Sequence, residues 1–124
     1  MNRKKLLNRT ALSIVFIFVL NFLANKLYWY SSFWYFDMIM HTLGGFFILL
    51  AIIYVFKINN LDFKSIVLAL LGVFIVGISW EVFEFVFNNV LAGQVFNIYD
   101  TLSDICFDML GGILALFYSL KRIM

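Results

Sequence analysis

Four long apolar stretches divide this chain, and each has the length that a helix needs to cross a membrane. A transmembrane helix takes about 20 apolar residues to span a hydrocarbon core of about 30 Å. The stretches cover approximately residues 10–30, 36–56, 65–88 and 101–120. Because 65% of the 124 residues are hydrophobic and none is proline, lipid is the expected solvent. We therefore predict one all-α integral membrane domain, residues 1–124, with four transmembrane helices.

Lysine and arginine residues flank these stretches and predict the orientation of the chain. Cytoplasmic flanks of membrane helices carry an excess of positive charge. Lys26 lies alone in the first loop, and the third loop, residues 89–99, contains no basic residue. The remaining basic residues are Arg3, Lys4, Lys5, Arg9, Lys57, Lys64, Lys121 and Arg122. We therefore expect both termini to be cytoplasmic, with the first and third loops outside.

The basic start, followed by an apolar run, resembles a signal peptide in outline. The run continues into an aromatic segment, residues 28–35, without a convincing small-residue cleavage site. Aromatic belts are typical of membrane interfaces. We therefore interpret the first stretch as a retained membrane anchor.

Acidic residues are concentrated inside the apolar stretches or at their outer ends, beside the only histidine. An ionisable side chain at the centre of a membrane helix costs about 2.5–3.5 kcal/mol on insertion scales, so such residues indicate a functional site. With the expected orientation, all of them lie in the outer half of the membrane. The residues are Asp37, His41, Glu81, Glu84, Asp100, Asp104 and Asp108.

The spacing of these residues predicts that they face one another. Residues three or four apart share one face of a helix, as Asp37 and His41 do in the second stretch. The third stretch carries Gly77, Glu81, Glu84 and Asn88 at this spacing, and the fourth carries Asp100, Asp104, Asp108 and Gly111 or Gly112. Each row has polar side chains towards the outer face of the membrane and small residues, mainly glycine, deeper in the membrane. We therefore expect the helices to pack closely at the small residues, beneath a shared polar site.

The excess of carboxylates favours a bound cation. Two carboxylates about 4 Å apart repel each other by about 4 kcal/mol at an effective dielectric constant near 20. Either some are protonated or a cation lies among them, because no Lys or Arg occurs within these three stretches. Oxygen ligands with one imidazole suit a divalent metal ion: Mg²⁺, Mn²⁺, Ca²⁺ or iron. The metal ligands that we predict are His41, Glu81, Glu84, Asp104 and Asp108.

Three of these carboxylates lie a turn or more inside their helices and are the predicted catalytic groups. They are Glu81, Glu84 and Asp108, one of which would serve as a general base. Asp37, Asp100 and Asn88 are expected to support the site from its edge.

Structural roles remain open for several of the polar residues. Asp100 before Thr101 is typical of a helix N-cap, and Thr101 with Asp104 matches a capping box. Asp37 could simply begin the second helix. His41 could satisfy a single hydrogen bond between helices.

An internal similarity suggests two related helical hairpins. A shift of 67 positions, the difference between 104 and 37, places Asp37 on Asp104 and His41 on Asp108. The glycine pair at 44–45 then falls on the pair at 111–112. A duplication of this kind would be a parallel repeat about an axis along the membrane normal. Chance matching in a chain rich in Phe and Leu is the alternative.

The order of the polar motifs resembles a family of small bacterial membrane proteins. The motifs are Asp37-Met-Ile-Met-His41, Trp80-Glu81-Val-Phe-Glu84 and Asp100-Thr-Leu-Ser-Asp104-Ile-Cys-Phe-Asp108-Met-Leu-Gly111-Gly112. They look like those of YjdF-like proteins and, more distantly, of VanZ-like proteins. VanZ-like proteins commonly carry Gln at the position of Glu84 and Asn at the position of Asp108. The resemblance covers the second to fourth stretches. It implies a multi-pass protein of a bacterial cytoplasmic membrane and brings no settled mechanism.

Three functions fit these patterns. The first is a metal-dependent enzyme acting on a lipid or cell-envelope head group, whose phosphate oxygens the metal would bind. The second is a proton- or cation-coupled transporter, although residues 48–56, 65–76 and 113–120 lack the charged groups that an ion path normally needs. The third is a structural or accessory membrane protein.

The expected partners follow from the same composition. Membrane lipids are expected to surround the chain, a homo-oligomer is left open, and no nucleic-acid site is predicted. Cys106 is the only cysteine, so an internal disulfide is excluded. It lies off the acidic face of its helix and is read as a small apolar residue.

Overall fold

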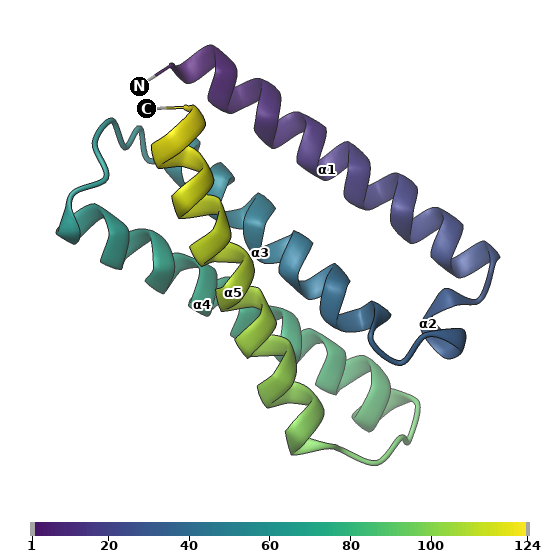
Figure 1. The fold of residues 1–124 in the computed structure, drawn as a ribbon. Coiled ribbons are helices and arrows are strands. Elements are labelled where there is room, and N and C mark those ends of the chain that lie inside the picture. Colours follow the sequence, from purple (N-terminus) through teal and green to yellow (C-terminus); the bar gives the residue numbers. More distant parts are fainter. Residues whose placement is uncertain (1, 124) are drawn as a thin grey trace.

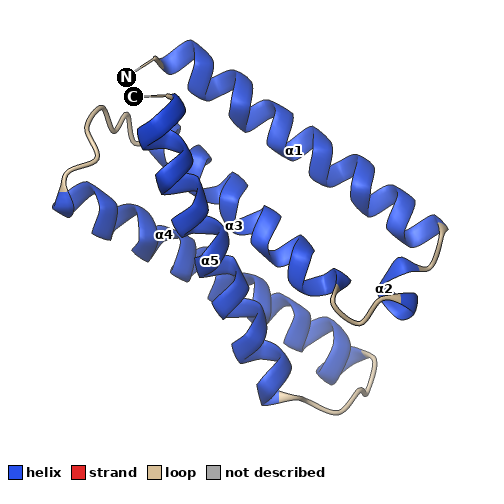
Figure 2. Cartoon of the chain, viewed as in Figure 1, coloured by secondary structure: helices blue, strands red, loops and turns tan. Residues whose placement is uncertain are grey.

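The computed structural model describes residues 2–123, which form helices and connecting loops without any strand (Figures 1 and 2). The long helices are α1 (Arg3–Lys26), α3 (Phe36–Val55), α4 (Phe63–Glu84) and α5 (Ile98–Arg122). A short helix, α2 (Trp29–Ser32), follows α1, and a π-helix, η1 (Phe85–Leu91), prolongs α4. Four helices are long and apolar enough to cross a membrane, which confirms the predicted all-α architecture.

The first helix lies earlier in the chain than its predicted range of 10–30. It begins at Arg3 because the Asn2 side chain caps it, accepting a hydrogen bond from the Lys5 backbone N–H. It ends at Lys26, and Tyr28 then takes the left-handed conformation, with φ of 59°. The basic residues at the start therefore belong to the helix itself. Part of the predicted aromatic segment forms α2.

The cap of α5 is also different from the predicted one. Asn97, and not Asp100, caps the helix, because the Asn97 side chain accepts hydrogen bonds from the backbone N–H groups of Tyr99 and Asp100. Asp104 takes no part in a capping box with Thr101. Its side chain is buried beside His41 of α3, at 2% exposure. The capping interpretation of both aspartates is therefore wrong.

Helices α3 and α5 form the central pair of the fold (Figure 1). Helix α1 packs against α3, whereas α4 contacts both α3 and α5. Helices α1 and α4 have no Cα atoms within 8 Å of each other in the described chain, so α3 separates them. That α1 packs on α3 as α4 packs on α5 agrees with two related hairpins. Of the two outer helices, however, α4 contacts the other hairpin and α1 does not. The repeat itself stays a prediction.

Two glycines allow α3 and α5 to approach each other closely. A Cβ atom added to Gly45 would overlap the backbone carbonyl of Asp108, and one added to Gly111 would overlap the carbonyl of Thr42. No side chain of any size fits at either position, as expected for small residues between membrane helices. The close crossing carries His41 of α3 next to Asp108 of α5.

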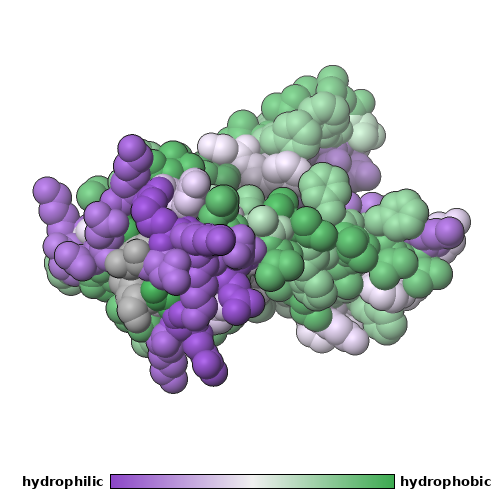
Figure 3. Space-filling view, turned by 90° about the horizontal axis from the view of Figure 1, so that it is seen from above, coloured by the Kyte–Doolittle hydropathy of each residue, from purple (hydrophilic) through white to green (hydrophobic). Residues whose placement is uncertain are grey.

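The end of the bundle that carries both termini is packed with apolar side chains. The buried core cluster consists of Leu6, Leu49, Leu50, Ile53, Ala69, Val73, Ala115, Leu116 and Ile123. Arg3 joins α1 to the end of α3, because its guanidinium donates a 2.8 Å hydrogen bond to the Tyr54 carbonyl and lies over the Tyr54 ring. Hydrophilic side chains gather at this end of the molecule, on the left of Figure 3, while the rest of that face is largely hydrophobic.

Both ends of the chain lie at the same end of the bundle, as an even number of crossings requires (Figure 1). The Asn2 backbone N–H donates to the carbonyl of Ile123 at 3.4 Å. The packed core therefore lies in the membrane half next to the termini. By charge, this half is expected to be cytoplasmic.

Candidate functional site

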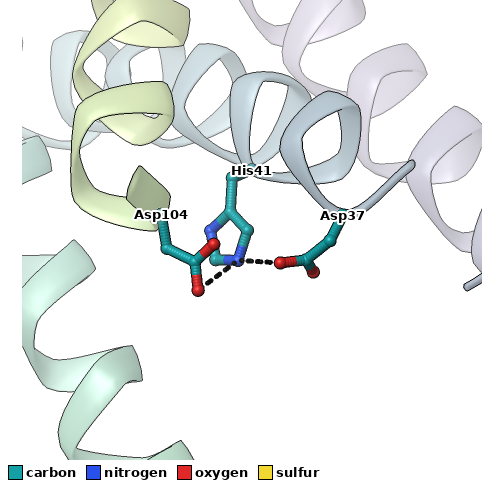
Figure 4. A group of neighbouring side chains, drawn as sticks. All are labelled: Asp37, His41 and Asp104. Carbon is teal, nitrogen blue, oxygen red and sulfur yellow. Dashed lines mark ion pairs between the residues drawn. The ribbon is translucent and has the colours of Figure 1, made fainter. Parts of the chain in front are cut away.

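His41 lies at the centre of a group of acidic side chains from α3 and α5. It is buried, and its Nδ1 atom lies 2.9 Å from Asp108 Oδ1. Its Nε2 atom lies 3.4 Å from Asp104 Oδ2 and 3.6 Å from Asp37 Oδ2. Figure 4 shows these two carboxylates on either side of the same ring nitrogen. A single imidazole therefore connects carboxylates of two helices.

The tautomer of His41 decides which ring nitrogen donates to these carboxylates. A neutral imidazole carries one N–H, and the shortest contact is that between Nδ1 and Asp108. If Nδ1–H donates to Asp108, the lone pair of Nε2 points at Asp37 and Asp104. This is the arrangement of a metal-binding histidine whose far nitrogen is held by a carboxylate.

A second group of carboxylates adjoins the first from α4. One oxygen each of Glu81, Glu84 and Asp104 lies within 4.8 Å of the others, and the same limit holds for the ligand atoms of Asp37, His41 and Asp104. Asp104 belongs to both groups. We call Asp104 and the five side chains near it the polar cup, which therefore consists of Asp37, His41, Glu81, Glu84, Asp104 and Asp108.

Two oxygen atoms of the polar cup are buried without a hydrogen-bond partner among the described residues. They are Asp104 Oδ2 and Glu81 Oε1. Burying a charged carboxylate without compensation is expensive, and buried polar groups in native proteins nearly always have partners. Glu84 differs, because its Oε1 accepts a 2.8 Å hydrogen bond from the Trp80 indole N–H. A cation or a proton would satisfy the two unpaired atoms.

The structure brings together all five predicted metal ligands, and it gives two aspartates unexpected neighbours. Asp37, predicted only as a supporting residue, faces His41 Nε2 and stands in a group with metal-binding spacing. Asp108, predicted as a ligand and catalytic group, lies 2.9 Å from His41 Nδ1 and belongs to neither group with metal-binding spacing. Asp100 and Asn88 belong to neither group of side chains with metal-binding spacing. They line a smaller cavity of about 90 Å³ on the outer side of the polar cup, together with Glu81 and Glu84.

A larger cavity of about 810 Å³ opens beside the polar cup, between α1, α3 and α4. Its polar lining consists of Asn21, Asn25, Tyr30, Asp37, His41, Glu84, Asn88 and Asp108. Its apolar lining includes Ile14, Ile17, Phe18, Ile48 and Val76, which lie deeper in the membrane. Because α1 and α4 do not meet, this cavity lies between two helices that are exposed to lipid.

The sequence interpretation missed the contribution of α1 to this cavity. Asn21 and Asn25 line it, and Asn21 accepts a 2.7 Å hydrogen bond from the Tyr30 hydroxyl. The signal was present, since two amides four residues apart mark one face of an otherwise apolar helix. The Trp80 hydrogen bond to Glu84 has the same spacing.

Tyr30 offers a spectroscopic report on the charge of the polar cup. Burial, followed by repulsion from Asp37 and Glu84, raises the pKa of the Tyr30 hydroxyl above its ordinary value. A divalent cation bound near those carboxylates would cancel part of the repulsion, so we expect it to lower the pKa of Tyr30. The measurement is an alkaline absorbance titration of phenolate formation, with and without Mn²⁺. Subtracting the titration of Tyr30→Phe isolates this residue, and an unchanged Tyr30 titration in saturating Mn²⁺ would contradict cation binding beside it.

Comparison with protein families gives one match that covers the chain. The model described as "Predicted membrane protein (DUF2238)" matches residues 1–123. No curated protein and no solved structure matches.

Proposed function

The chain belongs to the DUF2238 family of predicted membrane proteins, and from the geometry of its polar cup and cavity we propose that it is a membrane enzyme acting on a lipid head group with a divalent cation. The head group would belong to a lipid of the cell envelope and would carry a phosphate ester. The site would lie in the outer half of a bacterial cytoplasmic membrane, according to the distribution of basic residues. The YjdF-like motifs agree with this family, while the likeness to VanZ-like proteins remains a resemblance.

The observation that carries the proposal is the change of polarity along the 810 Å³ cavity. From Asp37 to Ile48 it follows α3 for eleven residues, or about 16 Å at 1.5 Å per residue. One end is lined by carboxylates, amides and His41, and the other by aliphatic side chains. A lipid has the same polarity in the same direction, with its head group at the interface and its chain in the membrane.

The charge of the polar cup calls for a cation between protein and phosphate. Five carboxylates surround one histidine, and no Lys or Arg among the described residues lines either cavity. An anionic head group would be repelled by these acids alone. A divalent cation held by His41 and neighbouring carboxylates would bind the phosphate oxygens and polarise the phosphorus centre.

The chain also supplies a group that could activate water. Asp108 lines the 810 Å³ cavity and belongs to neither group of side chains with metal-binding spacing. As a general base it would take the proton of a water molecule whose oxygen attacks phosphorus. The ester P–O bond would then break, and the proton would pass to the leaving oxygen. The proposed reaction class is therefore metal-assisted hydrolysis of a phosphate ester.

The packed half of the bundle supports an enzyme over a transporter. Below the polar cup, the core is buried and apolar at Leu49, Leu50, Ile53, Ala115 and Leu116. A proton or ion path normally has polar or ionisable groups along its length. The third function, a structural or accessory protein, is tested by the same experiments, because it predicts no turnover.

The test uses the purified protein in vesicles made from a bacterial total lipid extract. We expect Mn²⁺ or Mg²⁺ to support release of a phosphate-bearing product, detected by phosphorus NMR and mass spectrometry, and EDTA to abolish it. Full turnover after removal of metal would overturn the role of the cation. Absence of turnover with every divalent cation would overturn the enzyme.

Gly44 allows the cavity to be blocked without disturbing the helix packing. It lines the 810 Å³ cavity, and a Cβ atom added there would meet no atom within 4 Å. Gly44→Phe should therefore fill the cavity, abolish turnover and leave Mn²⁺ binding intact. Leu114→Phe, on the exposed face of α5, is the matched control and should keep its turnover. Normal turnover by Gly44→Phe would rule out the cavity as the lipid site.

A further inference from the structure

We propose that the polar cup binds two divalent cations that share Asp104 as a common ligand. This inference rests on the proposed function and specifies how its cation site is built. A site with one cation would satisfy the proposed function equally well, so the two ideas are separable by experiment.

Two sets of side chains with metal-binding spacing meet at Asp104. The first set is Asp37 and His41 of α3 with Asp104 of α5, and the second is Glu81 and Glu84 of α4 with the same aspartate. Within each set, one ligand atom per residue lies within 4.8 Å of the others. Asp104 therefore stands between ligands that come from opposite sides, one set on α3 and the other on α4.

The burial of Asp104 points to ligands of its own. It is the most deeply buried acidic residue, at 2% exposure, and its Oδ2 atom has no hydrogen-bond partner among the described residues. Glu81 Oε1 is buried and unpartnered in the same way. An ionised carboxylate has about four lone-pair positions on its two oxygens, so one aspartate can bind two cations.

The balance of charge favours two cations over one. The two sets contain four carboxylates: Asp37, Glu81, Glu84 and Asp104. Two divalent cations would neutralise these four carboxylates, whereas one cation would leave two of the four negative charges uncompensated. Asp108, the fifth carboxylate of the polar cup, belongs to neither set and lies 2.9 Å from His41 Nδ1.

The chemistry of the two sets indicates the ion to use as a probe. Imidazole suits Mn²⁺ or iron better than Mg²⁺ or Ca²⁺, whereas a set made only of carboxylates suits Mg²⁺, Ca²⁺ or Mn²⁺. Mn²⁺ is acceptable to both. Paired metal ions about 3.5–4 Å apart stabilise the attacking and leaving oxygens of phosphate ester hydrolysis, which agrees with the proposed reaction.

The experiment counts Mn²⁺ ions and measures their magnetic coupling in the full-length protein. We expect two Mn²⁺ ions per chain, with the electron paramagnetic resonance spectrum of a spin-coupled pair. Asp37→Asn and Glu84→Gln keep the shape of the side chain but each should remove one ion and leave the spectrum of isolated Mn²⁺. Asp100→Asn, outside both sets, should retain the coupled pair.

Three results would overturn the shared site. They are one Mn²⁺ per chain in the wild type, two uncoupled ions in the wild type, or a coupled pair that survives in Asp37→Asn or Glu84→Gln. Circular dichroism of each variant shows whether it has folded. Complete absence of Mn²⁺ binding would overturn the proposed function as well, whereas a single ion would overturn only the pair.

Discussion

Replacing Gly45 or Gly111 by alanine is expected to destabilise the protein more than the same replacement at any other glycine. The added Cβ atom would overlap the backbone of the facing helix, at the carbonyl of Asp108 or of Thr42. A backbone carbonyl cannot rotate away like a side chain, so α3 and α5 would have to separate. Overpacking in a core typically costs about 1–3 kcal/mol, and we expect at least the upper part of this range.

The measurement is thermal unfolding in detergent, followed by circular dichroism. Gly44→Ala is the matched control, because it adds the same methyl group one residue away, where nothing lies within 4 Å. It should unfold at the wild-type temperature or slightly above it, since alanine is the better helix former. Equal melting temperatures for Gly44→Ala and Gly45→Ala would show that α3 and α5 do not cross as described.

Replacing Asp104 by asparagine is expected to abolish cation binding while the protein stays folded. Asparagine keeps the size of the side chain but removes the charge from the one residue common to both ligand sets. A ligand present at 100 times its Kd stabilises a protein by about 2.7 kcal/mol. The wild type should therefore melt at a higher temperature in saturating Mn²⁺, and Asp104→Asn should show no such increase.

The control for this experiment is Asp100→Asn, one turn earlier on the same helix. Asp100 is exposed and belongs to neither ligand set, so its variant should keep the cation-induced increase in melting temperature. A full increase in Asp104→Asn would mean that the cation binds elsewhere. If neither variant showed the increase in melting temperature with Mn²⁺, the increase would depend on the total negative charge of the helix and not on a specific cation site at Asp104.

The sequence was sufficient to predict the membrane helices and the residues of the polar cup. Hydropathy over about 20 residues identifies a crossing regardless of its neighbours, and all four crossings are present. The i,i+4 spacing predicts that Asp37 and His41 share one helix face, and in the structure Asp37 Oδ2 lies 3.6 Å from His41 Nε2. Such patterns are local, and so they can be read from one chain.

Details that depend on how helices meet could not be predicted in this way. Which ring nitrogen of His41 faces Asp108 depends on the crossing of α3 and α5, which Gly45 and Gly111 determine. Asn21 has a role only because α1 lies across the cavity from α4. Helix ends were also misplaced, since a single side chain such as Asn97 decides where α5 begins.

Elemental mass spectrometry of the gently purified protein tests the central claim most directly. The sample is the wild type, beside the Asp104→Asn variant, which keeps the shape of the side chain and removes the charge of the one residue common to both ligand sets. The account predicts divalent metal in at least stoichiometric amount in the wild type and its loss from a still-folded variant. A wild-type protein that holds no metal, even after incubation with Mn²⁺, Mg²⁺, Ca²⁺ and Fe²⁺, would contradict it.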